Sequence, residues 1–158
     1  MTAPICCPKF DPTPWQDKLF TWEGKRFVKD RVWSFYYMPL NFGMVMRRVD
    51  ARVRAANAVM PEFQCLADHL SKWKIDIYTA VDKEIPGANN VKLSGRFLSR
   101  VYEGPFSDTG KWCQDFESYA REQSLFVHKW YMWYTTCPKC AKKYGKNYVV
   151  IVGQVPAA

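Results

Sequence analysis

The stretch SGRFLSRVYEGPFSDTGKWCQDFESYAREQ, residues 94–123, places a strand directly before a helix. Its first half is rich in β-forming residues and ends at Pro105, which cannot continue a strand ladder. Ser107 or Asp108 can cap a helix that extends to about Gln123. That helix has an apolar stripe at helical spacing, formed by Trp112, Phe116 and Tyr119. The stretch therefore predicts a strand and an amphipathic helix in series.

Elements of the same two kinds flank this stretch. Aromatic and β-branched residues predict strands at 126–136 and 148–155, the second a continuous apolar run. Upstream, the pattern predicts a strand at 26–39, a helix with one apolar face at 43–57, and another strand at 73–85. The order of the elements shows a rough doubling, without a repeat of the sequence itself.

This order predicts the α+β fold class, an antiparallel sheet with helices on one face. Residues 58–73 show no clear pattern. Four prolines between Pro4 and Pro14 break helix and strand alike. We therefore predict an irregular N-terminal arm over residues 1–26, packed on a single domain of residues 27–158.

The composition is that of one globular domain. The chain has 158 residues, of which 48% are hydrophobic and 16% aromatic, enough for a sizeable core. No apolar run approaches the roughly 18–20 residues that span a bilayer, and the N-terminus has no apolar signal core. These features predict a cytoplasmic protein with no membrane partner.

The net charge of +8 raises the question of a nucleic-acid partner, because Lys and Arg neutralise phosphates. The basic residues lie mainly in MRRVDARVR, residues 46–54, and after Cys137, and there is no basic tail. The arginine-rich helix has no partner helix of the helix-turn-helix type. We therefore predict no nucleic-acid partner.

Six cysteines in a cytoplasmic chain are more typical of thiols or metal ligands than of disulfides. Cys137 and Cys140 form a CPKC motif, and Cys6 and Cys7 form a second pair. Together they could supply the four thiolates of a structural zinc site, whose negative charge the neighbouring lysines would offset. The same lysines would lower the pKa of a cysteine and create a reactive or redox-active thiol. A structural role without chemistry stays open as well.

The strand at 126–136 contains KWYMWY, which is apolar on both faces. One face has to meet helices, and the other can line a cleft, as aromatic side chains do in small-molecule sites. The residues predicted to form the walls of this cleft are Trp33, Tyr37, Tyr102, Trp130, Met132 and Tyr134. No catalytic constellation is visible, but Glu103 stands at a strand end beside these aromatics and is the candidate general base.

Taken together, SGRFLSRVYEGPF, a tryptophan-bearing helix, the strand KWYMWYTTCP and the final strand YVVIVGQV resemble the GyrI-like (gyrase-inhibitor-like) small-molecule-binding domain of the SOUL/GyrI superfamily. Gly104 and Pro105 match where a strand closes before a helix, and Tyr134 and Pro138 match at the end of the aromatic strand. The resemblance covers about residues 33–155. The arm and the CPKC segment resemble a stand-alone, hydrolase-like subfamily.

The resemblance implies two β-α-β-β halves side by side, with a cleft between them that binds hydrophobic, often cationic compounds. It also implies that some stand-alone relatives hydrolyse cyclopropane-bearing alkylating compounds with a pocket carboxylate. The family commonly has a glutamate two residues before the tyrosine of the aromatic strand, where this chain has Met132. Glu103 is the residue that could take its place.

The sequence therefore predicts a stand-alone domain that binds a small hydrophobic or aromatic molecule in an aromatic-lined cleft. One alternative is a hydrolase of strained or activated small molecules with Glu103 as base. Another is a thiol-reactive or redox protein that uses Cys137 and Cys140. Structural zinc is the one cofactor that these patterns indicate.

Overall fold

The computed structural model describes the chain except for residues 1–9, 37, 62–63, 136–144, 146 and 158. The chain divides into two compact units. The central unit comprises residues 22–94, and the terminal unit comprises residues 1–21 and 95–158.

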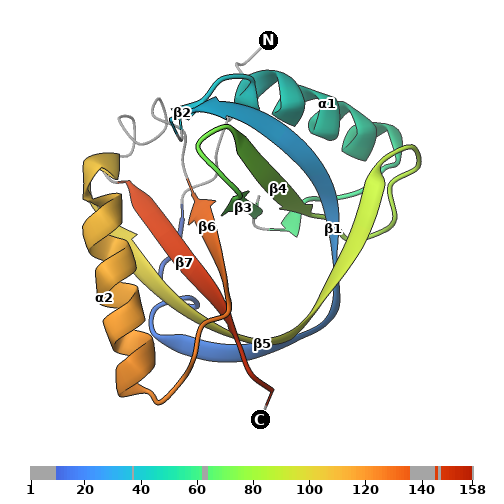
Figure 1. Cartoon of the computed structure of the whole chain (residues 1–158). Helices are drawn as coiled ribbons and strands as arrows, with labels where there is room; N and C mark the ends of the chain where they lie inside the picture. Colours follow the sequence, from blue (N-terminus) through green and yellow to red (C-terminus); the bar gives the residue numbers. More distant parts are fainter. Residues whose placement is uncertain (1–9, 37, 62–63, 136–144, 146, 158) are drawn as a thin grey trace. The chain divides into compact units, whose positions relative to one another are not determined.

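The central unit is an antiparallel sheet with one α-helix beside it (Figure 1). Its strands are hydrogen-bonded in the order β2-β1-β4-β3. Its elements are most of β1 (Lys18–Phe35), then β2 (Met38–Pro39), α1 (Phe42–Ala55), β3 (Cys65–His69) and β4 (Lys74–Ala80), and the first residues of β5 (Asn89–Glu103). The helix buries one stripe of residues spaced four apart, formed by Val45, Val49 and Val53.

The terminal unit contains a three-stranded antiparallel sheet in the order β6-β7-β5 and one α-helix (Figure 1). Its elements are β5 (Asn89–Glu103), the short 3₁₀ helix η2 (Phe106–Asp108), α2 (Thr109–Glu122), β6 (Lys129–Tyr134) and β7 (Tyr148–Val155). The buried residues of α2 are Trp112, Phe116 and Ala120. A Cβ atom at Gly153 of β7 would lie 2.9 Å from Cε1 of Phe116, so a glycine here lets the helix approach the sheet closely.

The predicted fold class, an antiparallel α+β sheet of two β-α-β-β halves with helices on one face and a cleft between the halves, is wrong. Strands dominate the structure, and the hydrogen-bonded order of the six longer strands returns to its start, because β1 pairs with β5 as well as with β4. These strands form a closed antiparallel system instead of an open sheet. The physical reason is length: β1 has 18 residues and β5 has 15, so each has room for more than one partner along its course.

Both α-helices are amphipathic and have 14 residues each. Their buried stripes have the helical spacing from which the sequence predicted a helix at these positions. Within the described part of the chain, neither helix has the length and the apolar content that a membrane span requires.

Candidate functional site

The two faces of the central sheet carry different side chains, because successive residues of a strand point to opposite faces. The residues of β1 on the face of α1 are Val28, Asp30 and Val32. The residues of β1 on the opposite face are Lys29, Arg31 and Trp33. The second face is therefore basic and aromatic along β1.

A buried aspartate meets the basic residues of β1. Asp76 of β4 lies directly opposite Arg31 in the strand register, and its side chain is only 6% exposed. Arg31 Nε donates to Asp76 Oδ1 at 2.9 Å, and Lys29 Nζ lies 3.5 Å from Asp76 Oδ2. The hydrogen bond to Asp76, together with its negative charge, raises the pKa of the Arg31 guanidinium above its usual value. Asp76 thus lies between two cationic side chains.

A second carboxylate neighbours Asp76 on the adjacent strand. Asp68 of β3 is directly opposite Asp76 in the antiparallel register. Like charges in this arrangement repel and destabilise a sheet. Lys29 and Arg31, which both contact Asp76, offset this repulsion.

On the other face of β1, Asp30 is bound by Arg48 of α1. Arg48 Nη2 lies 2.8 Å from each carboxylate oxygen, and Arg48 Nε donates to Asp30 Oδ2 at 3.3 Å. The backbone N–H of Arg31 donates to Asp30 Oδ1 at 2.8 Å. These contacts fix the position of the Arg48 guanidinium relative to β1.

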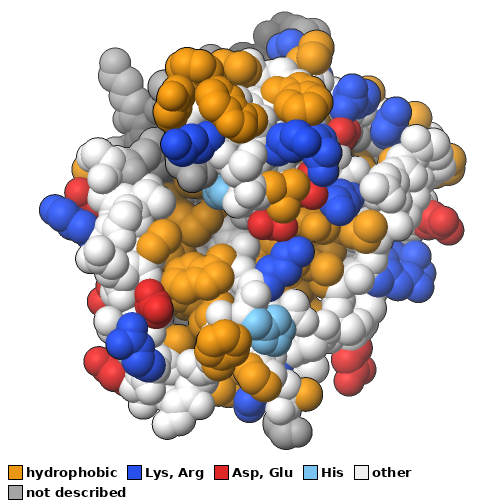
Figure 2. All heavy atoms as spheres, in the orientation of Figure 1, with side chains coloured by type: hydrophobic (Ala, Val, Ile, Leu, Met, Phe, Trp, Pro, Cys, Tyr) orange, Lys and Arg blue, Asp and Glu red, His pale blue; other side chains and the backbone are white. Residues whose placement is uncertain are grey.

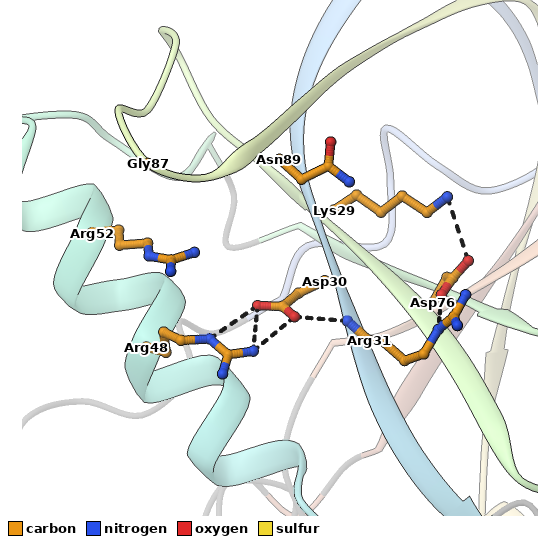
Figure 3. Close-up of a pocket in the computed structure, with 8 residues that line it drawn as sticks. All are labelled: Lys29, Asp30, Arg31, Arg48, Arg52, Asp76, Gly87 and Asn89. Atoms are coloured by element: carbon orange, nitrogen blue, oxygen red, sulfur yellow. Dashed lines mark hydrogen bonds and ion pairs between the residues drawn. The ribbon is translucent and has the colours of Figure 1, made fainter.

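The two groups of ion pairs border a cavity of about 530 Å³ in the central unit (Figure 3). We call it the charged cavity; its lining consists of Lys29, Asp30, Arg31, Arg48, Arg52, Asp76, Gly87 and Asn89. Four cationic side chains and two carboxylates give it a formal charge of +2. Its volume is that of a small-molecule site, but it is open to solvent and its lining is charged, so charge and not apolar burial would select a ligand.

Arg52 differs from the other cations of the charged cavity. It follows Arg48 by about one helical turn, and both side chains extend from α1 toward β1 (Figure 3). Among the described residues, the Arg52 side chain has no hydrogen-bond or ion-pair partner, whereas Lys29, Arg31 and Arg48 each contact a carboxylate. The Arg52 guanidinium is therefore the cation of this cavity that is left to bind an added anion.

Four of the predicted cleft residues lie together on one face of the terminal sheet. They are Tyr102 on β5 and Trp130, Met132 and Tyr134 on β6. Helix α2 packs against this group: the ring centroids of Phe116 and Trp130 are 5.1 Å apart, and Trp112 stacks on Tyr102 at 5.8 Å. Met132 is buried. The structure thus brings these four residues together on the face that α2 covers.

Two tyrosines of this group have raised pKa values. Burial is the main cause for Tyr102, whose hydroxyl donates to Asp115 Oδ2 at 2.6 Å, and that hydrogen bond raises the pKa further. Burial raises the pKa of Tyr134 to about 12, with an additional contribution from Cys113. Both hydroxyls are protonated at neutral pH, and that of Tyr102 already donates its proton to Asp115.

The remaining predicted residues are not part of this group. Trp33, in the central unit, is 51% exposed, and Glu103 is exposed at the end of β5. The predicted residues outside the described part of the chain are Tyr37, Cys6, Cys7, Cys137 and Cys140. Among the residues that are described, no group of three or more His, Cys, Asp or Glu side chains could hold a metal ion. The zinc site stays a prediction, since its four cysteine ligands lie outside the described residues.

The charged cavity was not predicted from the sequence. A local signal exists at Asp76, which alternates with Ile75 and Ile77 and therefore points away from the apolar face of its strand. The arginines of α1 also have helical spacing, but the bond between Arg48 and Asp30 depends on how the helix packs. No local pattern reveals that packing.

Known proteins similar to this chain fall into one sequence family and one group of structures. The family model described as Bacterial hydrolase matches residues 1–155. The crystal structure of the EcmrR C-terminal domain matches with a TM-score of 0.65 at 8% sequence identity, covering 91% of this chain and 99% of that chain. The structure of SAV2435 bound to tetraphenylphosphonium matches with a TM-score of 0.51 at 11% identity, covering 89% of this chain and 93% of that chain. A search of curated proteins found no match. At these identities the likeness to both structures is one of fold alone.

Proposed function

The chain belongs to the bacterial hydrolase family, and on that premise we propose that it binds a small organic molecule with an acidic group. The charged cavity of the central unit is the proposed site. The observation that carries the proposal is the Arg52 side chain, which lines the cavity and pairs with no carboxylate among the described residues.

Charge decides which kind of ligand the charged cavity favours. An organic cation would enter a cavity of formal charge +2, whereas an anion would reduce that charge. Arg48 and Arg52, about one turn apart, can present two guanidinium groups to one carboxylate or phosphate. Arg48 is already held by Asp30, so little side-chain freedom is lost there on binding.

Trp33 is an exposed aromatic residue of the central unit, but it does not line the charged cavity. Its side chain points to the face of β1 opposite to α1, the helix that carries Arg48 and Arg52. About half of its surface is exposed, which leaves ring area for an aromatic group. A purely hydrophobic molecule, held by Trp33 or by the predicted residues of β5 and β6, is the second candidate.

Two ions of similar shape and opposite charge test the proposal. The neighbour SAV2435 was solved with tetraphenylphosphonium, and tetraphenylborate carries the same four phenyl rings with a negative charge. We expect tetraphenylborate to raise the melting temperature of this protein in differential scanning fluorimetry, and tetraphenylphosphonium to leave it unchanged. A larger effect of the phosphonium would contradict an anion site and favour the hydrophobic, cation-tolerant candidate.

A charge-removing variant places the effect in the cavity. Arg52→Gln is expected to abolish the shift that tetraphenylborate causes. Arg47→Gln is the matched control, because Arg47 is exposed on the same helix and does not line the cavity. If both variants lose the shift equally, the borate responds to the net charge of the protein, and the charged cavity is not its site.

Turnover of the bound molecule is the alternative function, which the family description favours. Glu103, at the end of β5, is the candidate base, and Glu103→Gln should then bind a cyclopropane-bearing substrate without hydrolysing it. Unchanged turnover in that variant would exclude Glu103 as the base.

The thiol-based alternative uses Cys137 and Cys140. It is tested by titration of the thiols in the native protein, where slow reaction of both would speak against it.

A further inference from the structure

Five large apolar side chains of the central unit are exposed near the end of β1 and the turn between β3 and β4. We call this group the aromatic tip; its members are Phe35, Tyr36, Leu40, Leu70 and Trp73, each between 47% and 66% exposed. Figure 2 shows hydrophobic side chains gathered where β2 lies in Figure 1, with Lys and Arg side chains beside them. Exposed apolar groups of this size mark surfaces that contact a partner.

The three rings of the aromatic tip pack on one another. The ring centroid of Phe35 lies 4.9 Å from that of Tyr36 and 5.6 Å from that of Trp73, and Tyr36 lies 5.3 Å from Trp73. All three contacts are edge-on, which is a favourable geometry for aromatic pairs. The rings therefore form one continuous apolar surface that stays open to solvent.

Hydrogen bonds from Ser34 hold the two turns beneath this surface together. Its backbone N–H donates to the carbonyl oxygen of Trp73 and its hydroxyl donates to that of Lys72, both at 2.8 Å. Ser34 itself is buried. The N–H of Trp73 also donates to Ser71 Oγ at 3.1 Å. The segments that carry the exposed rings are thus joined by hydrogen bonds, so little backbone freedom would be lost when the tip binds.

The strained backbone of Tyr36 indicates that its exposed ring takes part in a function. β1 reverses into β2 between Phe35 and Met38, which are paired in the register. Tyr36 has a φ of 47°, a left-handed conformation in which tight hairpin turns favour Asn or Gly. A bulky residue in this conformation is strained, and strain of this kind concentrates at functional sites.

The charged residues next to the aromatic tip indicate which class of partner it binds. Residues 33–42 contain no charged side chain, and the only charges in residues 70–75 are those of Lys72 and Lys74. Lys72 Nζ lies 5.3 Å from the ring centroid of Tyr36, so a positive charge adjoins the apolar surface directly. Aromatic rings bordered by lysines, on two segments that contain no carboxylate, are the combination that binds the interface of an anionic bilayer.

We propose that the aromatic tip docks the protein on an anionic lipid surface. Phe35, Tyr36 and Trp73 would enter the headgroup region, and Lys72 and Lys74 would meet the lipid phosphates. The sequence predicted no membrane partner because no segment can span a bilayer, but docking on a surface needs no spanning segment.

Sedimentation with lipid vesicles tests the proposal on the full chain. We expect the protein to bind vesicles that contain phosphatidylglycerol at low salt, to bind more weakly at high salt, and to bind pure phosphatidylcholine vesicles far less. No binding to either kind of vesicle at low salt overturns the proposal. Equal binding to both kinds of vesicle also overturns the proposal, because the partner would then not be an anionic lipid surface.

Two variants of the tip locate the binding. Tyr36→Asn replaces the strained ring by a residue that tolerates the left-handed backbone, and it should weaken vesicle binding by roughly tenfold while preserving or raising the melting temperature. Lys72→Gln should weaken binding to phosphatidylglycerol vesicles by roughly fivefold. The matched controls are Phe126→Ser and Lys111→Gln, at exposed positions of the terminal unit. If the controls reduce binding as much as the tip variants, another surface binds the vesicles and the proposal fails.

Discussion

Arg31 and Asp76 face each other across β1 and β4, and Arg31 Nε lies 2.9 Å from Asp76 Oδ1. The two side chains differ sharply in exposure: that of Arg31 is 45% exposed and that of Asp76 only 6%. A nearly buried anion is thus held by a cation that reaches it from the solvent side. Loss of the pair should therefore depend on which partner is removed.

Asp76→Asn is expected to lower the free energy of unfolding by about 1–3 kcal/mol, because Lys29 and Arg31 are then left facing each other without a carboxylate. Urea unfolding measures the change. Asp50→Asn is the matched control, since Asp50 pairs with Arg54 at the surface of α1 and its removal should cost less than about 0.5 kcal/mol. Equal small losses would show that Asp76 contributes no more than a surface pair.

Two glycines should respond to alanine in opposite directions. A Cβ atom at Gly153 would lie 2.7 Å from Val127 Cγ1 and 2.9 Å from Phe116 Cε1, so Gly153→Ala should destabilise the protein by about 1–3 kcal/mol. Gly110, in the first turn of α2, has no atom within 4 Å of the corresponding position. Gly110→Ala should raise stability by up to about 1 kcal/mol. Thermal unfolding of both variants measures these changes in stability. If Gly153→Ala leaves the stability unchanged, α2 can shift away from the sheet.

Gln64 is fully buried, and its side-chain amide has no hydrogen-bond partner among the described residues. Gln64→Met keeps the approximate shape without the buried polar atoms and should stabilise the protein by about 1–2 kcal/mol. Gln123→Met, at an exposed position after α2, should have no effect. A destabilised Gln64→Met variant would show that the amide has a partner that the structure does not describe.

His69 should make stability depend on pH. Burial is the main cause that lowers its pKa below the usual 6.5, while Asp68 acts in the opposite direction. The unfolded chain therefore binds a proton more readily than the folded one. The contribution of neutral His69 is complete above pH 6.5 and is lost as the pH falls through the folded pKa.

Denaturant unfolding at a series of pH values tests this contribution. His69→Gln should lose less stability on acidification than the wild type, and the exposed His128→Gln should behave like the wild type. Identical slopes in all three proteins would contradict the assignment to His69.

The helices could be predicted from the sequence because their signals are local. The stripe of Val45, Val49 and Val53 and that of Trp112 and Phe116 repeat with the helical period, and both helices occur within two residues of the predicted bounds. The strand β3 was not predicted, because its five residues have no alternation of their own. Its extended form depends on pairing with β4, a contact that is distant from any local pattern.

At the start of β1, the sequence predicted irregular structure where a strand occurs. The prolines up to Pro14 predicted an irregular arm to residue 26, but β1 begins at Lys18, beyond the last of them. Likewise, the alternation of Trp130, Met132 and Tyr134 correctly placed them on one face of a strand. Which face meets α2 depends on tertiary packing, and so do the charges that line the cavity. Strand register and the packing of α1, which bring Arg48 to Asp30, cannot be predicted from any short segment of the sequence.

The boundary between the two units passes through β1 and β5, with no linker at either point. Recombination that exchanged one unit between relatives would have to rejoin two continuous strands. At each junction, a slip of one residue would send every later side chain to the wrong face. We therefore expect the two units to have been inherited as one block, with insertions accumulating at the turns.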